Sequence, residues 1–247
     1  MNPNPKRNSP IPRDVEQGLE QFCNQLRESL GDQLISVILY GGLAKGEFAP
    51  GSSDVNVMVV LTESTIPILD RLAPAVEQAR RDIRLSLLLL TEKDLASAAE
   101  VFSIKFLDVQ RYHQILWGKD VTSQLSITQE RLRRQCAREI MNLQLRLRQF
   151  YLQRLRRPEL IESTLKGAIS SFLTTLSVLL ELKTGETGST KAAVAAAAGK
   201  IGLNSEALDQ LLALKRGEMK PDAAGLKRLY SEFMQTVEQA ARVVEAL

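Results

Sequence analysis

Apolar positions along the first sixty residues switch between a helical spacing and short continuous runs. Residues 14–30 carry apolar side chains every three or four positions, which predicts a helix that ends at Gly31. Residues 34–40 and 54–61 are apolar runs rich in β-branched side chains. Such runs are typical of buried strands, so we expect two strands joined by the polar, glycine-containing segment between them.

The next segment repeats the alternation. Residues 65–80 have helical spacing, and the prolines at positions 67 and 74 are expected to break or bend that helix. Residues 83–90 read as a third strand, and residues 91–94 resemble a helix cap with its first turn. This order predicts one mixed sheet with helices packed on it.

Strand patterns disappear after about residue 122. Long helical patterns cover residues 131–155 and 159–182, and three shorter ones follow, the last over residues 223–247. We therefore expect a disordered tail over residues 1–13, an α/β domain over residues 14–121 and an all-α helical bundle over residues 122–247.

Composition excludes several classes of protein. The chain has 247 residues, 25% of them charged, and a formal net charge of only +3, which is far from the basic excess of a dedicated DNA-binding domain. Cys23 and Cys136 lie far apart and outside any CxxC spacing, so neither a disulfide framework nor a structural zinc site is expected, and a reducing cytoplasm is the predicted location. Residues 167–180 form the longest uncharged stretch, which is shorter than the ~20 residues that span a bilayer, so no membrane segment is predicted.

The candidate functional residues lie in the segment that connects the first two predicted strands and at the adjoining strand ends. Residues 36–47 read Ser-Val-Ile-Leu-Tyr-Gly-Gly-Leu-Ala-Lys-Gly-Glu, and residues 50–60 read Pro-Gly-Ser-Ser-Asp-Val-Asn-Val-Met-Val-Val. This stretch resembles the nucleotidyltransferase superfamily, which includes the aminoglycoside adenylyltransferases. There a strand leads to Gly-Ser, then Ala-Arg-Gly-Glu, a Pro-Gly turn and Ser-Asp-x-Asp on the next strand. The resemblance covers residues 34–61 closely and residues 83–90 more loosely.

The resemblance implies a fold, ligands and roles. It implies a nucleotidyltransferase α/β domain with a helical C-terminal domain, and ATP or another nucleoside triphosphate with Mg²⁺ as ligands. Backbone N–H groups of the glycine turn would hold the phosphates. The matching nucleotide-binding positions are Gly41, Gly42, Lys45 and Ser53. In the family, two aspartates at i and i+2 share one face of a strand and, with a third carboxylate on a neighbouring strand, hold two Mg²⁺ ions about 4 Å apart.

This sequence departs from the family pattern at the metal positions. Asp54 is retained as the candidate catalytic and metal-binding carboxylate, but Asn56 replaces the second aspartate. The third carboxylate position falls at about Ser86, Gly42 replaces a phosphate-binding serine, and Lys45 replaces an arginine. A unit charge about 4 Å from another is worth roughly 4 kcal/mol at an effective dielectric of 20. The resemblance therefore predicts a metal site, at Asp54 and Asn56, that lacks most of its charge.

Three functions stay open on the sequence alone. The first is a weakly active or non-catalytic pseudoenzyme that binds a nucleotide or a protein partner. The second is an active adenylyltransferase for a small molecule or a protein, in which Glu47, Glu63 or Asp82 replaces a missing ligand. The third is an interaction protein that binds its partner through the helical half and keeps only a vestigial cleft.

The arginine-rich segment and the single histidine do not point to a further function. Arginines concentrate over residues 131–157, which either line a cleft for phosphates or RNA or form the solvated face of a long helix. Aromatic side chains are sparse there, so nucleic acid is not expected as a partner. His113 is the only histidine and has no candidate partner nearby in sequence, which favours a half-buried structural or cleft-lining role. The sequence leaves a homodimer open.

Overall fold

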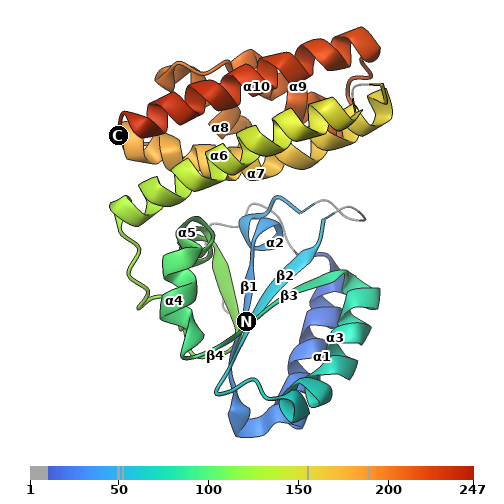
Figure 1. Cartoon of the computed structure of the whole chain (residues 1–247). Coiled ribbons are helices and arrows are strands. Elements are labelled where there is room, and N and C mark those ends of the chain that lie inside the picture. Colours follow the sequence, from blue (N-terminus) through green and yellow to red (C-terminus); the bar gives the residue numbers. More distant parts are fainter. Residues whose placement is uncertain (1–10, 49–50, 52, 155, 189) are drawn as a thin grey trace. The chain divides into compact units, whose positions relative to one another are not determined.

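The computed structural model describes residues 11–48, 51, 53–154, 156–188 and 190–247. The chain divides into two compact units, one up to Ile127 and the other from Thr128 onward, and each is described by itself (Figure 1). Residues 1–10 of the predicted disordered tail lie outside the described residues. The first described helix begins at Arg13.

The first unit contains a mixed sheet with helices on both faces. In chain order its described elements are α1 (Arg13–Leu30), η1 (Gly31–Gln33), β1 (Leu34–Tyr40), α2 (Gly42–Lys45), β2 (Val55–Leu61), α3 (Ile66–Ile83), β3 (Leu85–Thr91), α4 (Asp94–Val101), α5 (Ser103–Arg111) and β4 (His113–Gly118). The strand order is β3-β2-β1-β4, with β1 antiparallel to both β2 and β4 and with β2 parallel to β3. The predicted mixed-sheet α/β class is confirmed.

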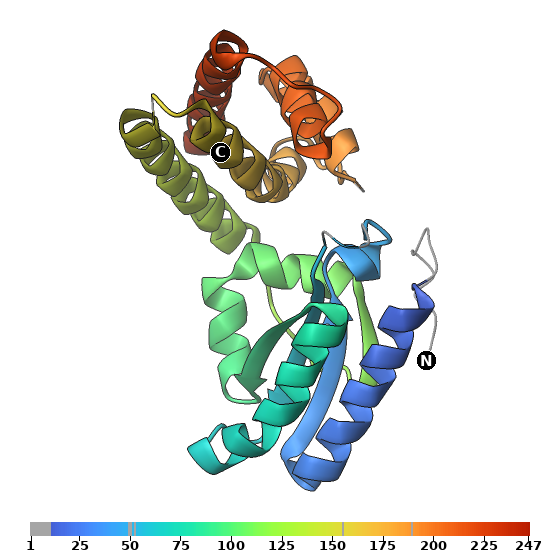
Figure 2. The same cartoon turned by 90° about the vertical axis from the view of Figure 1, so that its right-hand side faces the viewer.

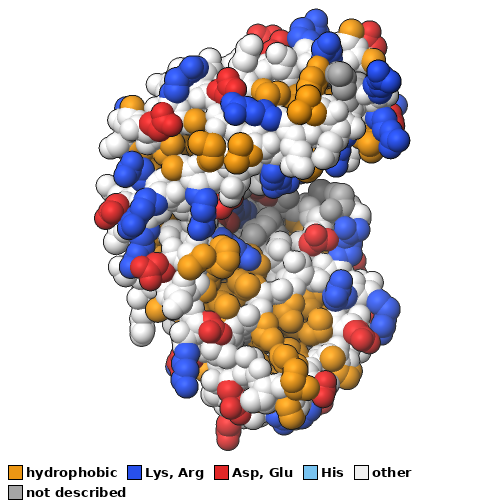
Figure 3. All heavy atoms as spheres, viewed as in Figure 1, with side chains coloured by type: hydrophobic (Ala, Val, Ile, Leu, Met, Phe, Trp, Pro, Cys, Tyr) orange, Lys and Arg blue, Asp and Glu red, His pale blue; other side chains and the backbone are white. Residues whose placement is uncertain are grey.

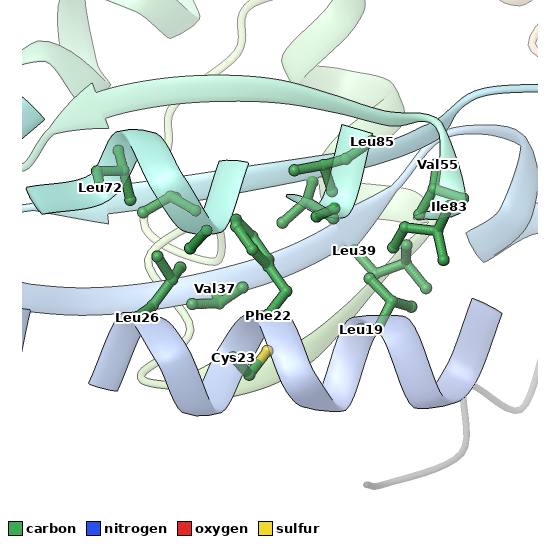
Figure 4. Close-up of a cluster of buried hydrophobic side chains, with 14 of the residues drawn as sticks. Leu19, Phe22, Cys23, Leu26, Val37, Leu39, Val55, Leu72, Ile83 and Leu85 are labelled. Carbon is green, nitrogen blue, oxygen red and sulfur yellow. The ribbon is translucent and has the colours of Figure 1, made fainter. Parts of the chain in front are cut away.

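Alternating side chains of the strands build two hydrophobic cores. One face of the sheet carries Val37, Leu39 and Val57, which pack with buried side chains of α1 and α3. The other face carries Ile38 and Met58, which pack with side chains of α4 and α5. Figures 1 and 2 show α1 and α3 together on one face and α4 and α5 on the other. Figure 4 shows the first core, where Phe22 and Leu26 of α1 point toward the sheet.

Helix α3 was expected to be broken or bent at its prolines, and it is not broken. It continues through Pro67 and Pro74 without interruption. Pro67 lies in the first turn, where a missing N–H costs nothing, and the apolar face of α3 packs on the sheet across Pro74. The helix also extends to Ile83, so β3 begins at Leu85 instead of residue 83, and Asp82 lies in the last turn of α3.

The second unit is entirely helical in its described residues. Its elements are α6 (Gln129–Arg154), α7 (Pro158–Thr184), α8 (Lys191–Ala197), η2 (Ala198–Ile201), α9 (Ser205–Arg216) and α10 (Ala223–Glu245). Phe172 of α7 meets Phe233 of α10 edge to face, with ring centroids 5.5 Å apart. The Tyr230 hydroxyl donates to the Leu147 carbonyl at 2.7 Å, which ties α10 to α6.

Helix α7 is the one described helix that is long and apolar enough to cross a membrane by length and composition. In the structure, 56% of its most apolar window is buried. It packs against α6, α8, α9 and α10. A core helix of a helical domain has this composition and these contacts, and α7 occupies that place here.

Candidate functional site

The register of the sheet places four polar or aromatic residues in one row. Ser86 pairs with Asn56, Asn56 with Tyr40, and Tyr40 with His113. Paired residues of neighbouring strands direct their side chains to the same face. Asp54 precedes β2 and lies two residues before Asn56, so the strand alternation places both side chains on the same face. Residues that lie far apart in the sequence are thus brought to one end of the sheet.

The glycine turn after β1 is conformationally specific. Gly41 has φ 75° and ψ −150°, a combination that only glycine adopts readily. A Cβ at Gly41 would lie 2.9 Å from the amide nitrogen of Asn56, so the turn approaches β2 closely. At Gly42 the nearest atom to an added Cβ is the Glu47 carbonyl oxygen at 3.7 Å, an ordinary contact. The first glycine is required by the backbone, and the second is not.

The retained aspartate is paired with an arginine. Arg84 donates from Nη2 and Nε to Oδ1 of Asp54 at 3.1 and 3.3 Å, and from Nη1 to the Gly51 carbonyl at 3.3 Å. Both side chains of the ion pair are about half exposed, 53% for Arg84 and 57% for Asp54. Arg84 therefore contacts both the candidate carboxylate and the backbone of Gly51.

Arg84 occupies a costly backbone conformation. Its φ is 54° and its ψ is 44°, and it is the one non-glycine residue with positive φ in the described part of the chain. The left-handed conformation costs a non-glycine residue roughly 1–2 kcal/mol. This conformation ends α3, where the Arg84 N–H donates to the Ala79 carbonyl. Sequence reasoning missed Arg84, because a basic residue at a helix end is common.

The two neighbouring metal positions of the family pattern carry neutral side chains. Asn56 donates from Nδ2 to the backbone carbonyl of Asp54 at 3.3 Å, so its amide is engaged along its own strand. Ser86 lies beside it on β3. Within the described ranges, no three His, Cys, Asp or Glu side chains are close enough together to hold a metal ion. One carboxylate, one amide and one hydroxyl supply much less negative charge than three carboxylates do.

The acids that were candidates for replacing a missing ligand differ in position. Glu63 follows β2 at the end opposite to Asp54, and the strand between them separates the two by about 25 Å or more. Glu63 cannot join Asp54 on a metal ion. Asp82 lies in the last turn of α3 and not on the strand that carries Ser86. Glu47 follows α2, and its N–H donates to the Gly42 carbonyl at 2.8 Å.

The predicted nucleotide-binding lysine has a partner. Lys45 Nζ lies 2.5 Å from Oδ1 of Asp108 on α5, and the two side chains are only 20% and 26% exposed. The same ammonium lies 5.1 Å from the centroid of the Tyr112 ring. A phosphate that reached Lys45 would compete with Asp108. Ser53 lies directly before Asp54 and is half-buried.

The row also contains Tyr40, which sequence reasoning did not expect at the site, and His113, for which a cleft-lining role was left open. Tyr40 is 7% exposed, and burial raises the pKa of its hydroxyl to about 12. The Lys105 ammonium lies 5.4 Å from the centroid of the Tyr40 ring, and burial lowers the Lys105 pKa. His113 is held by neighbours: Nδ1 lies 2.9 Å from the Val109 carbonyl oxygen, and Nε2 lies 3.6 Å from Oδ2 of Asp120.

A cavity of about 620 Å³ opens beside Asp54. Its lining residues are Asp54, Val76, Arg80, Arg84, Leu85, Ser86 and Leu87. Two guanidinium groups at one cavity favour an anionic ligand, because guanidinium groups match phosphate and carboxylate oxygens in charge and geometry.

Comparisons with known proteins support the fold. No family model matches the chain, and no curated protein matches its sequence significantly. Among solved structures, the chain is similar to spectinomycin adenyltransferase AAD(9) from Enterococcus faecialis, which was crystallised with ATP and spectinomycin. The TM-score is 0.57 at 14% sequence identity, over 89% of this chain and 99% of that one. The chain therefore has the nucleotidyltransferase fold, an α/β domain with a mixed sheet followed by a helical domain.

Proposed function

We propose that this protein binds a nucleotide at the end of the sheet and transfers nucleotidyl groups weakly or not at all. The observation that carries the proposal is the ion pair between Asp54 and Arg84, which lies next to Asn56 and Ser86. Three carboxylates attract a pair of Mg²⁺ ions, but here a guanidinium already compensates the single carboxylate. This set of side chains does not suit two divalent ions.

In the proposed complex, protein cations neutralise the phosphates in place of Mg²⁺. Arg84 and Arg80 line the cavity beside Asp54, and Lys45 follows the glycine turn. Arginine binds phosphate oxygens through two parallel N–H groups, which gives both charge and orientation. The ATP in the similar AAD(9) structure supports a nucleoside triphosphate as the ligand. An acceptor substrate is not carried over, because 14% identity speaks for the fold alone.

A paired substitution tests the role of Arg84. Arg84→Gln removes the guanidinium from the cavity, whereas Arg81→Gln removes an exposed guanidinium from the last turn of the same helix without touching the cavity. Isothermal titration with ATP should show about tenfold weaker binding for Arg84→Gln, the loss of one charge-assisted contact, and unchanged binding for Arg81→Gln. Equal effects of the two substitutions would contradict the site.

A turnover assay separates the proposal from an active transferase. Incubation with labelled ATP and candidate small-molecule or protein acceptors is expected to give no transfer at ordinary enzymatic rates. Brisk transfer that disappears in Asp54→Ala would establish the active adenylyltransferase instead. If the protein binds no nucleotide at all, the interaction protein with a vestigial cleft is the function that remains.

A further inference from the structure

The outer edge of β3 carries unpaired backbone groups. The strand ends the sheet order on one side. Toward β2, the Val55 N–H donates to the Arg84 carbonyl and the Glu92 N–H donates to the Leu61 carbonyl, so the even-numbered positions face β2. The N–H and C=O groups of Leu85, Leu87 and Leu89 therefore point outward, since backbone groups alternate along a strand. No described residue forms a hydrogen bond with these outward groups.

The sequence of this edge lacks the usual protection. The strand reads Leu-Ser-Leu-Leu-Leu-Leu-Thr over residues 85–91, without a charge, a proline or a glycine. Natural edge strands commonly carry such residues, because an unprotected edge pairs with another chain. Leu87, Leu88, Leu89 and Leu90 all remain partly exposed. Figure 3, which has the view of Figure 1, shows hydrophobic side chains on the surface of the first unit in the region that β3 crosses.

We propose that this edge pairs with the same edge of a second copy of the chain, antiparallel and about a two-fold axis at Leu88. In an antiparallel pair, residues that exchange hydrogen bonds must both point their N–H and C=O groups toward the partner. An axis at Leu88 places Leu87 opposite Leu89 of the second copy, and both residues meet this condition. The resulting sheet is continuous through both copies and leaves neither β3 edge exposed.

Charged residues at the ends of β3 favour this register over the registers shifted by two residues. With the axis at Leu88, Arg84 directly before β3 lies opposite Glu92 of the second copy, directly after β3, at both ends of the paired strands. Arg84 pairs with Asp54 and Glu92 with Lys119 in the single chain, both through exposed side chains. A slip of two residues in one direction places Arg84 opposite Leu90 instead. A slip in the other direction places it opposite Asp94, whose carboxylate already accepts hydrogen bonds from the N–H and hydroxyl of Thr91 at 2.8 and 2.7 Å. The exposed Glu92 carboxylate can contact a second cation, whereas the Asp94 carboxylate is held by two hydrogen bonds from Thr91, so the symmetric register at Leu88 is favoured.

The chain's own N-terminal segment is the other candidate to cover this edge. A second copy is favoured over the chain's own first ten residues, because the prolines at positions 3, 5 and 10 have no N–H to donate to a strand.

A single cysteine at the axis tests the register. Facing residues that do not exchange hydrogen bonds in an antiparallel pair have Cα atoms about 4.5 Å apart, within the range of a disulfide. Leu88→Cys should therefore form a reducible covalent dimer under mild oxidation. The native thiols of Cys23 and Cys136 are free and buried, and burial raises the pKa of each to about 12, which keeps them unreactive.

Leu90→Cys is the matched control. Leu90 lies on the same strand and face, but in this register it is ~13 Å from its counterpart along the strand direction. It should remain monomeric on a non-reducing gel. Absence of the covalent dimer in Leu88→Cys, or equal cross-linking of the two variants, would overturn the proposed pairing.

A proline tests the interface without cross-linking. The Leu89 N–H points outward, so Leu89→Pro removes no hydrogen bond to β2 but removes two donors, one from each copy, across the axis. Sedimentation velocity should show a dimer for the wild type and for Leu89→Val, and at least tenfold weaker dimerisation for Leu89→Pro. Circular dichroism checks that each variant is folded. A monomeric wild type, or a folded Leu89→Pro variant that dimerises as tightly, would refute the proposal.

Discussion

The guanidinium of Arg84 lies 3.1 Å from the carboxylate of Asp54, between the end of α3 and the start of β2. This contact joins the one acidic residue that the family pattern retains to the one described non-glycine residue with a left-handed backbone. Strained residues persist where surrounding structure holds them in place, and they concentrate at functional sites. We therefore place Arg84 at the centre of the proposed nucleotide site.

Replacing Arg84 by glycine and by alanine separates the backbone strain from the ion pair. Both variants lack the guanidinium, and the exposed ion pair contributes little to stability in either case. Glycine adopts a φ of 54° without steric cost, whereas alanine does not. Chemical denaturation should therefore show Arg84→Gly to be more stable than Arg84→Ala by about 1 kcal/mol. Equal stability of the two variants would show that position 84 is not strained.

The two adjacent glycines provide a second matched pair. Gly41→Ala forces a φ of 75° on a residue with a Cβ and brings that Cβ within 2.9 Å of the Asn56 amide nitrogen. We expect a loss of ~2 kcal/mol, which lowers Tm by about 4 °C per kcal/mol in a unit of this size. Gly42→Ala should leave Tm unchanged within a few degrees, because its added Cβ has room. Thermal denaturation measures both, and similar losses would contradict the described turn.

Asp108 is expected to limit the availability of Lys45. Asp108→Asn removes the carboxylate that lies 2.5 Å from the Lys45 ammonium. The freed ammonium should then bind nucleotide phosphates, raising ATP affinity by roughly three- to tenfold, or about 0.7–1.4 kcal/mol. Isothermal titration measures the change. The gain should vanish when Lys45→Met is added. A gain that survives this second substitution would show that Lys45 does not contact the nucleotide.

Restoring the missing acids should create a metal site. The triple variant Asn56→Asp, Ser86→Asp and Arg84→Gln places carboxylates at position 56 of β2 and position 86 of β3, beside Asp54 directly before β2, and removes the competing guanidinium. Carboxylate oxygens are the ligands that hard cations require. Electron paramagnetic resonance with Mn²⁺ should detect a bound ion in this variant and none in the wild type. Adding Asp54→Ala should abolish the signal. Mn²⁺ binding by the wild type as tight as that of the triple variant would contradict the account.

Three of the four described strands and the glycine turn could be predicted from local sequence. The strand of residues 34–40 matches β1, and the alignment that placed Ser86 beside the other metal positions agrees with the register of β2 and β3. Strand β4 was missed, because an edge strand that is mostly half-exposed and carries His113 and Gln114 lacks a clear apolar run. The proline at position 74 was expected to break or bend its helix, but the helix continues because packing of α3 on the sheet outweighs the lost hydrogen bond.

The partners of the site residues could not be predicted from the sequence. Arg84 is thirty positions from Asp54, and Lys45 is more than sixty from Asp108. These two ion pairs form only because helices α3 and α5 pack against the sheet with their ends near Asp54 and Lys45. Local sequence patterns do not predict this packing. The incomplete carboxylate set, by contrast, was predicted from residue identities alone and stays a prediction about metal binding.

The metal dependence of ATP binding tests the central claim most directly. The dissociation constant of ATP should be measured by isothermal titration on the wild-type protein, once with Mg²⁺ and once with EDTA. If protein cations take the place of the metal, the two constants should agree within about threefold, or ~0.7 kcal/mol. Binding that requires Mg²⁺ and is lost in EDTA would contradict the account.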